Sequence, residues 1–154
     1  MLDLTSFCVN YGRSAKGGNM IKPEKFNFEN LEVWQKAVEF AQGVLNLTES
    51  INSHQKHFRI IEQLESASTS VALNIAEGHG RYSKREFIHF LYVARGSLYE
   101  TITLLIILNR YNCIEEKQLF ELKLIAEQIA KMLSGLISSI KRSFTTNTEL
   151  RTPN

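Results

Sequence analysis

Proline is absent from the long interior of this chain. The 154 residues contain only two prolines, Pro23 and Pro153, and both lie near the ends. Because proline breaks the interior of an α-helix, a stretch without proline permits long uninterrupted helices. From residue 30 onward, apolar residues recur at alternating steps of three and four, the period of a helix that buries one face. We therefore predict an all-α fold.

The apolar period divides into four predicted helices, at about residues 30–51, 56–77, 83–112 and 115–142. Four helices of similar length joined by short turns pack most simply as an antiparallel up-down-up-down four-helix bundle. We expect a flexible leader at 1–25, the bundle at 26–143 and a flexible tail at 144–154. The residues predicted to start or stop helices are Asn30 as an N-cap, Gly78 and Gly80 as a left-handed C-cap, and Ser83 with Glu86 as a capping box.

Two of the predicted helices carry more apolar surface than a helix of a four-helix bundle normally buries. On the first helix we assign the core to one stripe, Leu31, Trp34, Val38, Ala41, Leu45 and Thr48. Each of these two helices also carries a second apolar stripe, which lies roughly 100–120° around the helix axis from the core stripe. The second stripes comprise Val33, Ala37, Phe40, Val44, Leu47 and Ile51 on the first helix, and Ile88, Tyr92, Tyr99, Ile102 and Ile106 on the third. Exposed apolar patches mark interfaces, so we predict a symmetric homo-oligomer, the alternative being offset packing within one monomer.

The composition excludes several classes of protein. The net charge of +2, from 18 basic and 16 acidic residues, is too balanced to indicate nucleic acid by itself. Two cysteines, Cys8 and Cys113, make neither a disulfide framework nor a zinc cage, and they fit a reduced cytoplasmic setting. No secretory segment is visible, and no window is long and apolar enough to span a membrane, so we expect no membrane association.

Catalytic and metal-binding patterns are not found in the sequence. A di-iron bundle needs two Glu-x-x-His motifs, and the only match is Glu86 with His89, which helical phase turns away from the core. No serine or cysteine stands beside a candidate base in a nucleophilic arrangement. We therefore expect no catalytic residue, no metal and no cofactor.

A basic cluster surrounds the predicted turn between the second and third helices. Six basic side chains stand there against one acid, Glu86: His79, Arg81, Lys84, Arg85, His89 and Arg95. Tyr82 and Tyr92 lie among them. Basic side chains neutralise phosphates and tyrosine rings stack on unpaired bases, which favours RNA binding. We name Arg81, Lys84, Arg85, Arg95 and Tyr82 as candidate nucleic-acid ligands, the alternative being a solvated helix start.

A polar stripe follows the second helix away from its core face: Arg59, Gln63, Ser66, Ser70, Asn74 and Glu77. Most of these side chains are small and uncharged, whereas lysine and glutamate dominate freely solvated helix faces. The stripe suits a contact with another subunit or with RNA. The alternative is an ordinary surface.

Three segments carry a resemblance to a known family: FENLEVWQKA, SVALNIAEGHGRYSKREFIHFLYVARGSLYE and AKMLSGLI. Over roughly residues 26–141 they resemble the S23 proteins, four-helix bundles encoded within intervening sequences of bacterial 23S ribosomal RNA genes and elsewhere in bacterial genomes. The accessory proteins of diversity-generating retroelements are similar in fold. The resemblance implies a ring-shaped homopentamer, nucleic-acid binding and no established catalysis.

The resemblance also assigns motif positions. Those at the corner between the second and third helices are Asn74, Glu77, Gly78, Gly80, Arg81 and Ser83, and those of the third helix are Gly96, Ser97 and Glu100. Relatives often have basic residues in the middle of the second helix, where this chain has Glu65 and Ser66. This departure argues against nucleic-acid binding through the second helix.

The sequence thus predicts a cytoplasmic, non-enzymatic, homo-oligomeric bundle that serves as a scaffold or RNA-associated accessory protein. The partners expected are other copies of the chain, and RNA or another nucleic acid. The alternative is a protein-interaction module with a protein partner and no nucleic-acid role.

Overall fold

The computed structural model describes residues 24–51 and 57–149, with side chains described as far as Phe144. This part contains a short 3-10 helix, η1 (Asn27–Asn30), and four α-helices: α2 (Glu32–Ser50), α3 (Phe58–His79), α4 (Lys84–Arg110) and α5 (Glu116–Glu149). Residues 1–23 of the predicted leader and 150–154 of the predicted tail lie outside the described residues.

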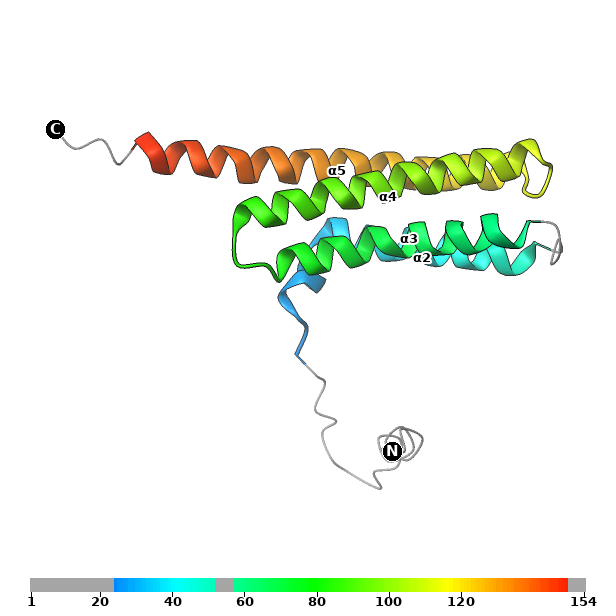
Figure 1. Cartoon of the computed structure of the whole chain (residues 1–154), viewed down its shortest axis with the longest axis horizontal. Helices are drawn as coiled ribbons and strands as arrows, with labels where there is room; N and C mark the ends of the chain where they lie inside the picture. The colour runs from blue at the N-terminus through cyan, green and yellow to red at the C-terminus, as the bar shows by residue number, and fades with distance from the viewer. Residues whose placement is uncertain (1–23, 52–56, 150–154) are drawn as a thin grey trace, which may run out of the picture.

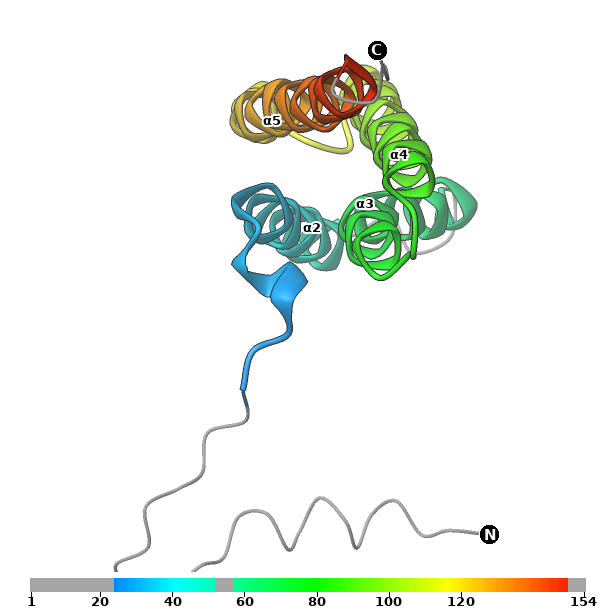
Figure 2. The same cartoon turned by 90° about the vertical axis from the view of Figure 1, so that its left-hand side faces the viewer.

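The four α-helices form an antiparallel bundle in which each helix packs against two neighbours. Figure 1 shows their lengthwise arrangement, and Figure 2 shows α2, α3, α4 and α5 following one another around the bundle axis. The most extensive contact joins α3 and α4, and α5 closes the bundle against both α4 and α2. The predicted all-α up-down-up-down fold is confirmed.

The helix ends agree in part with those predicted from the sequence. Ser83 is the N-cap of α4, and its hydroxyl oxygen accepts a hydrogen bond from the Glu86 amide at 3.2 Å. Asn30 was expected to cap the first helix but ends η1, and Leu31 flanks α2. Gly80 has a φ of −76°, so the predicted left-handed C-cap is wrong. Helix α5 continues to Glu149, past the predicted end of the bundle at residue 143 (Figure 1).

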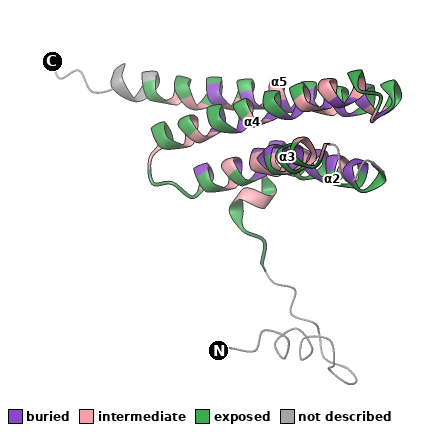
Figure 3. Cartoon of the chain, turned by 45° about the vertical axis from the view of Figure 1, so that its right-hand side comes forward, coloured by how far each residue is buried: buried purple, intermediate pink, exposed green. Residues whose placement is uncertain are grey.

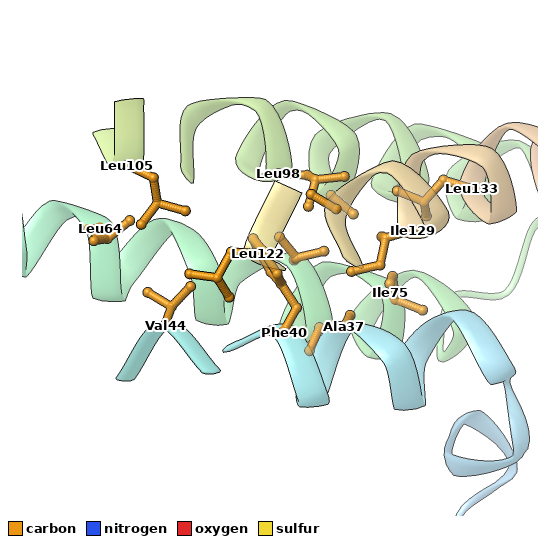
Figure 4. Packing of buried hydrophobic residues seen from close by; sticks show 14 of the residues in the cluster. Ala37, Phe40, Val44, Leu64, Ile75, Leu98, Leu105, Leu122, Ile129 and Leu133 are labelled. Carbon is orange, nitrogen blue, oxygen red and sulfur yellow. The ribbon is translucent and has the colours of Figure 1, made fainter. Parts of the chain in front are cut away.

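The core lies along the bundle axis, where the buried faces of the helices meet (Figure 3). Residues from all four α-helices interlock there, among them Phe40, Leu64, Leu98 and Ile129 (Figure 4). On the last three helices the apolar period predicts core positions that the structure confirms as buried: Leu64, Ser68, Val71, Ala72, Ile75, Leu91, Ala94, Leu98, Thr101, Leu105, Leu108, Leu122, Ala126, Ile129 and Leu133. Four further predicted positions are partly buried against the core: Ile61, Phe87, Leu136 and Ile140.

On α2 the two predicted stripes are exchanged. The residues predicted for an oligomer interface are buried inside the chain: Val33, Ala37, Phe40, Val44, Leu47 and Ile51. Their assignment to an interface is therefore wrong. Of the stripe predicted as core, Ala41 and Thr48 are buried, whereas Val38 is 37% exposed and Leu45 is 36% exposed. An apolar surface still remains on α2, but it lies on the other face.

Helix α4 is apolar enough to pass for a membrane span. Among the described helices it is the one with the length and composition for crossing a bilayer, with a hydropathy of 1.4, contrary to the sequence-based expectation. Its apolar residues have another explanation, because Leu91, Leu98 and Leu105 are buried against the other helices. The core helix of a bundle needs such a composition.

Candidate functional site

The corner between α3 and α4 is built on a close approach at Gly78. Gly78 is buried within α3, and a Cβ atom placed there would lie 2.5 Å from Phe90 Cβ and 3.0 Å from Phe87 Cδ2. No side chain larger than hydrogen fits without moving one of the two helices. Gly78 therefore permits close packing and does not end the helix.

Polar side chains join α3 to α4 along the edge of the bundle. The Ser70 and Ser97 hydroxyls lie 3.0 Å apart, and Asn74 Nδ2 donates to the Ser70 carbonyl at 2.7 Å and to its hydroxyl at 2.9 Å. Further along, Gln63 Nε2 donates to Glu100 Oε1 at 2.6 Å. Part of the polar stripe of α3 therefore has partners within the same chain, and the motif residues Ser97 and Glu100 supply them.

Arg81 and Tyr82 lie in the turn between α3 and α4. Arg81 forms an ion pair with Glu77, and its guanidinium carbon lies 4.8 Å from the centre of the Phe90 ring. Tyr82 is fully exposed. Arg81 was predicted to share a site with Lys84 and Arg85, and in the structure its guanidinium contacts Glu77 of α3 and Phe90 of α4.

The remaining predicted cations lie beside α5. Lys84 Nζ donates to the Ser143 hydroxyl at 3.0 Å, and Lys141 Nζ donates to the Tyr92 hydroxyl at 2.9 Å. The Arg95 guanidinium carbon lies 4.9 Å from the centre of the Tyr92 ring. We call Lys84, Arg85, Arg95 and Lys141 the α4–α5 basic face.

Among the residues that the structure describes, no carboxylate forms an ion pair with a cation of this face. Within residues 24–51 and 57–144, the ion pairs are Lys36–Glu39, Arg81–Glu77 and Lys131–Glu127. None of them includes a cation of the α4–α5 basic face. The hydrogen bond from Lys141 lowers the pKa of the Tyr92 hydroxyl below its ordinary value against a smaller opposing effect of desolvation, and the charges of Lys141 and Arg95 lower this pKa further.

A pocket of about 520 Å³ opens on the α4–α5 basic face. Arg85 and Ile88 line it from α4, and Lys141 and Phe144 line it from α5. Phe144 is 41% exposed, and Lys84 Nζ lies 5.9 Å from the centre of its ring. The pocket thus combines two cations with an exposed aromatic ring.

The sequence analysis missed Lys141 and Phe144 as parts of this site. Lys141 follows Tyr92 by 49 positions, and Phe144 was assigned to a flexible tail. The predicted topology could have identified both residues, because in an antiparallel bundle the last turns of the fourth helix lie beside the first turns of the third.

A second candidate surface is an apolar groove between α2 and α3, with a volume of about 630 Å³. We call it the α2–α3 groove. It is lined by Phe28, Trp34, Val38, Ala41, Gln42, Leu45, Thr69, Ala72, Leu73 and Ala76. Leu73 is 65% exposed there.

The interface residues predicted on α4 divide into two groups. Ile88, Ile102 and Ile106 are partly buried against the core of their own chain, as the alternative of offset packing within the monomer required. Tyr92 and Tyr99 are exposed. Gly96 is also exposed, and a Cβ atom added there would meet nothing within 4 Å.

Metal coordination finds no support in this arrangement. Within the residues that the structure describes, no group of three or more histidine, cysteine, aspartate or glutamate side chains is placed to hold a metal ion. Glu86 and His89 are both exposed, and Glu86 instead accepts a hydrogen bond from the Ser83 hydroxyl at 2.7 Å.

Comparison with known proteins assigns the chain to a family. Residues 29–135 match the 23S rRNA-intervening sequence proteins. The chain is similar to a protein with unknown function from the S23 ribosomal protein family of Bacteroides thetaiotaomicron VPI-5482, known from a crystal structure. The two share 30% identity with a TM-score of 0.65, over 69% of this chain and 95% of that one. No curated protein matches the sequence. This chain belongs to the 23S rRNA-intervening sequence protein family.

Proposed function

We propose that the protein is a non-enzymatic, homo-oligomeric scaffold of the cytoplasm that binds RNA through the α4–α5 basic face. One observation carries the RNA proposal: four cations from two helices lie together with no carboxylate partner among the described residues. Cations held in this way can neutralise phosphates of a nucleic-acid backbone. Tyr82, exposed in the turn, and Arg81 flank this face and add further contacts.

The α2–α3 groove supports self-association. Exposed apolar patches of this kind on a small protein mark interfaces, and a closed ring of identical chains is a symmetric way to cover one. The family resemblance supplies the number of chains, five. A ring carries one copy of the α4–α5 basic face on each chain. These copies together strengthen the positive electrostatic potential along a bound RNA.

The RNA proposal is tested by fluorescence anisotropy with a labelled RNA at several salt concentrations. Wild-type binding should weaken steeply as salt rises, because each phosphate contact releases a counterion. A variant with Lys84, Arg85, Arg95 and Lys141 changed to glutamine should bind weakly to every RNA and with a flatter salt dependence. Its circular dichroism should match the wild type, because all four side chains lie outside the core. Absence of salt-sensitive binding by the wild type would reject the proposal.

A second candidate function is a protein-interaction module without a nucleic-acid role, and the α2–α3 groove favours it. The groove is apolar, whereas a nucleic-acid surface is polar and basic. Salt-dependent binding to RNA separates the two functions, and light scattering tests what occupies the groove. A mass near five chains supports the ring, and a single-chain mass at micromolar concentration leaves the groove for a different protein.

A further inference from the structure

The pocket on the α4–α5 basic face has two chemically distinct parts. One part consists of Arg85 and Lys141, whose positive charges come from facing helices. The other part is apolar and consists of Ile88 and the exposed ring of Phe144. A nucleotide has the same two parts, a charged phosphate and a flat base. The volume of about 520 Å³ lies within the range of small-ligand pockets.

We propose that this pocket is a subsite for one unpaired nucleotide of single-stranded RNA, with the base stacked on Phe144 and its phosphate held by Arg85 and Lys141. The inference rests on the proposed function, because it names the kind of RNA that the α4–α5 basic face selects. A base inside a duplex has both faces covered by neighbouring bases, whereas an unpaired base offers a face for stacking.

The surroundings of Phe144 suit a stacked nucleotide. Lys84 Nζ lies 5.9 Å from the centre of the ring and donates to Ser143, the preceding residue. A positive charge therefore lies over one face of the Phe144 ring, where it can pair with a phosphate of the bound strand. The hydrogen bond from Lys141 to Tyr92 keeps the Lys141 ammonium beside the pocket.

The subsite combines residues inside and outside the range of the chain that matches the family. Arg85 and Ile88 lie within the residues matched by the family, which end at 135, and Lys141 and Phe144 lie beyond them. The continuation of α5 to Glu149 places Phe144 on a helix instead of in a tail.

The test compares a fluorescein-labelled oligouridylate with a duplex of the same strand length, using the full-length protein. Phe144→Ala should weaken binding to the oligouridylate about tenfold and leave binding to the duplex almost unchanged. Phe120→Ala is the matched control, because Phe120 is an exposed phenylalanine near the other end of α5. Phe144→Trp should restore binding, since the larger ring also stacks.

The charged part of the subsite is tested separately. Arg85→Gln with Lys141→Gln should flatten the dependence of log affinity on log salt by about 0.7 unit for each lost single-strand phosphate contact. Lys123→Gln, on the exposed face of α5, is the control and should change this salt dependence less.

Three outcomes overturn the inference. If Phe144→Ala behaves like Phe120→Ala while the wild type binds RNA, the subsite is wrong and the proposed function stands. Equal or tighter wild-type binding to the duplex also rejects the subsite alone. If the wild type binds neither RNA, the proposed function fails and the subsite fails with it.

Discussion

Gly78→Ala is the substitution whose cost the structure defines best. The new Cβ atom would lie 2.5 Å from Phe90 Cβ, and this neighbour cannot rotate away because a Cβ atom moves only with its backbone. The helices α3 and α4 must therefore separate at their most extensive contact. Overpacking of this kind costs about 3 kcal/mol, at the upper end of the usual range.

A smaller effect opposes this cost. Alanine is more favourable than glycine in a helix interior by about 1 kcal/mol, and Gly78 lies inside α3. The net destabilisation is therefore about 2 kcal/mol. At about 4 °C for each kcal/mol, the unfolding midpoint should fall by about 8 °C. Urea denaturation of the wild type and the variant at the same protein concentration compares their free energies of unfolding under equal conditions for self-association.

Gly80→Ala is the matched control, two residues further along. A Cβ atom at Gly80 would lie 3.5 Å from the Glu77 carbonyl oxygen, an ordinary contact, and the backbone is right-handed. Its stability should change by less than about 0.5 kcal/mol. If Gly78→Ala is as stable as Gly80→Ala, the close approach of α3 and α4 at Gly78 is not required and the reasoning fails.

Three further predictions concern the exposed surfaces. Gly96→Ala should stabilise the chain by up to about 1 kcal/mol, because its methyl group meets open space and alanine favours a helix; lower stability than Gly135→Ala, a matched variant on α5, would contradict this. Tyr92 should ionise below the ordinary pKa of tyrosine in an ultraviolet titration read as the difference from Tyr92→Phe, and Lys141→Gln should raise that pKa. An unshifted titration would place the two groups apart in solution. Leu73→Asp puts a charge in the α2–α3 groove and should reduce the mass seen by light scattering to one chain, with helicity retained; an unchanged mass removes the groove from the interface.

Periodicity located the helices and the buried faces of α3 and α4, although α4 also carries a second apolar stripe. On α2 both stripes are apolar, so a helical period alone does not tell which one faces the core. The buried stripe has a distinguishing feature that was available in the sequence. It runs unbroken from Val33 to Ile51 with Phe40 at its centre, whereas the other stripe ends in the polar residue Thr48.

The candidate site was predictable only on its α4 side. Lys84, Arg85 and Arg95 lie close together in the sequence, so their grouping is local. Lys141 and Phe144 join them through the packing of α5, which depends on how far two helices overlap along the bundle. Arg81 belongs to the same local group in the sequence, and in the structure its contacts with Glu77 and Phe90 hold it in the turn.

The hydroxyl groups inside the core make no hydrogen bonds between helices. The buried residues that carry them are Thr48, Ser68 and Thr101. Each side chain donates to a carbonyl of its own helix, at 2.8, 2.9 and 2.8 Å respectively. These groups remain satisfied wherever the neighbouring helix stands, so they do not select one axial position of that helix.

The edge contacts of α3 and α4 therefore fix the axial register of the bundle. A slip by one helical turn would separate the Ser70 and Ser97 hydroxyls and break the bond from Gln63 to Glu100. Apolar packing alone distinguishes such offsets weakly, whereas directional polar bonds distinguish them strongly. Loss of these contacts is expected to leave far-ultraviolet circular dichroism intact and to reduce the near-ultraviolet signal of a unique native state.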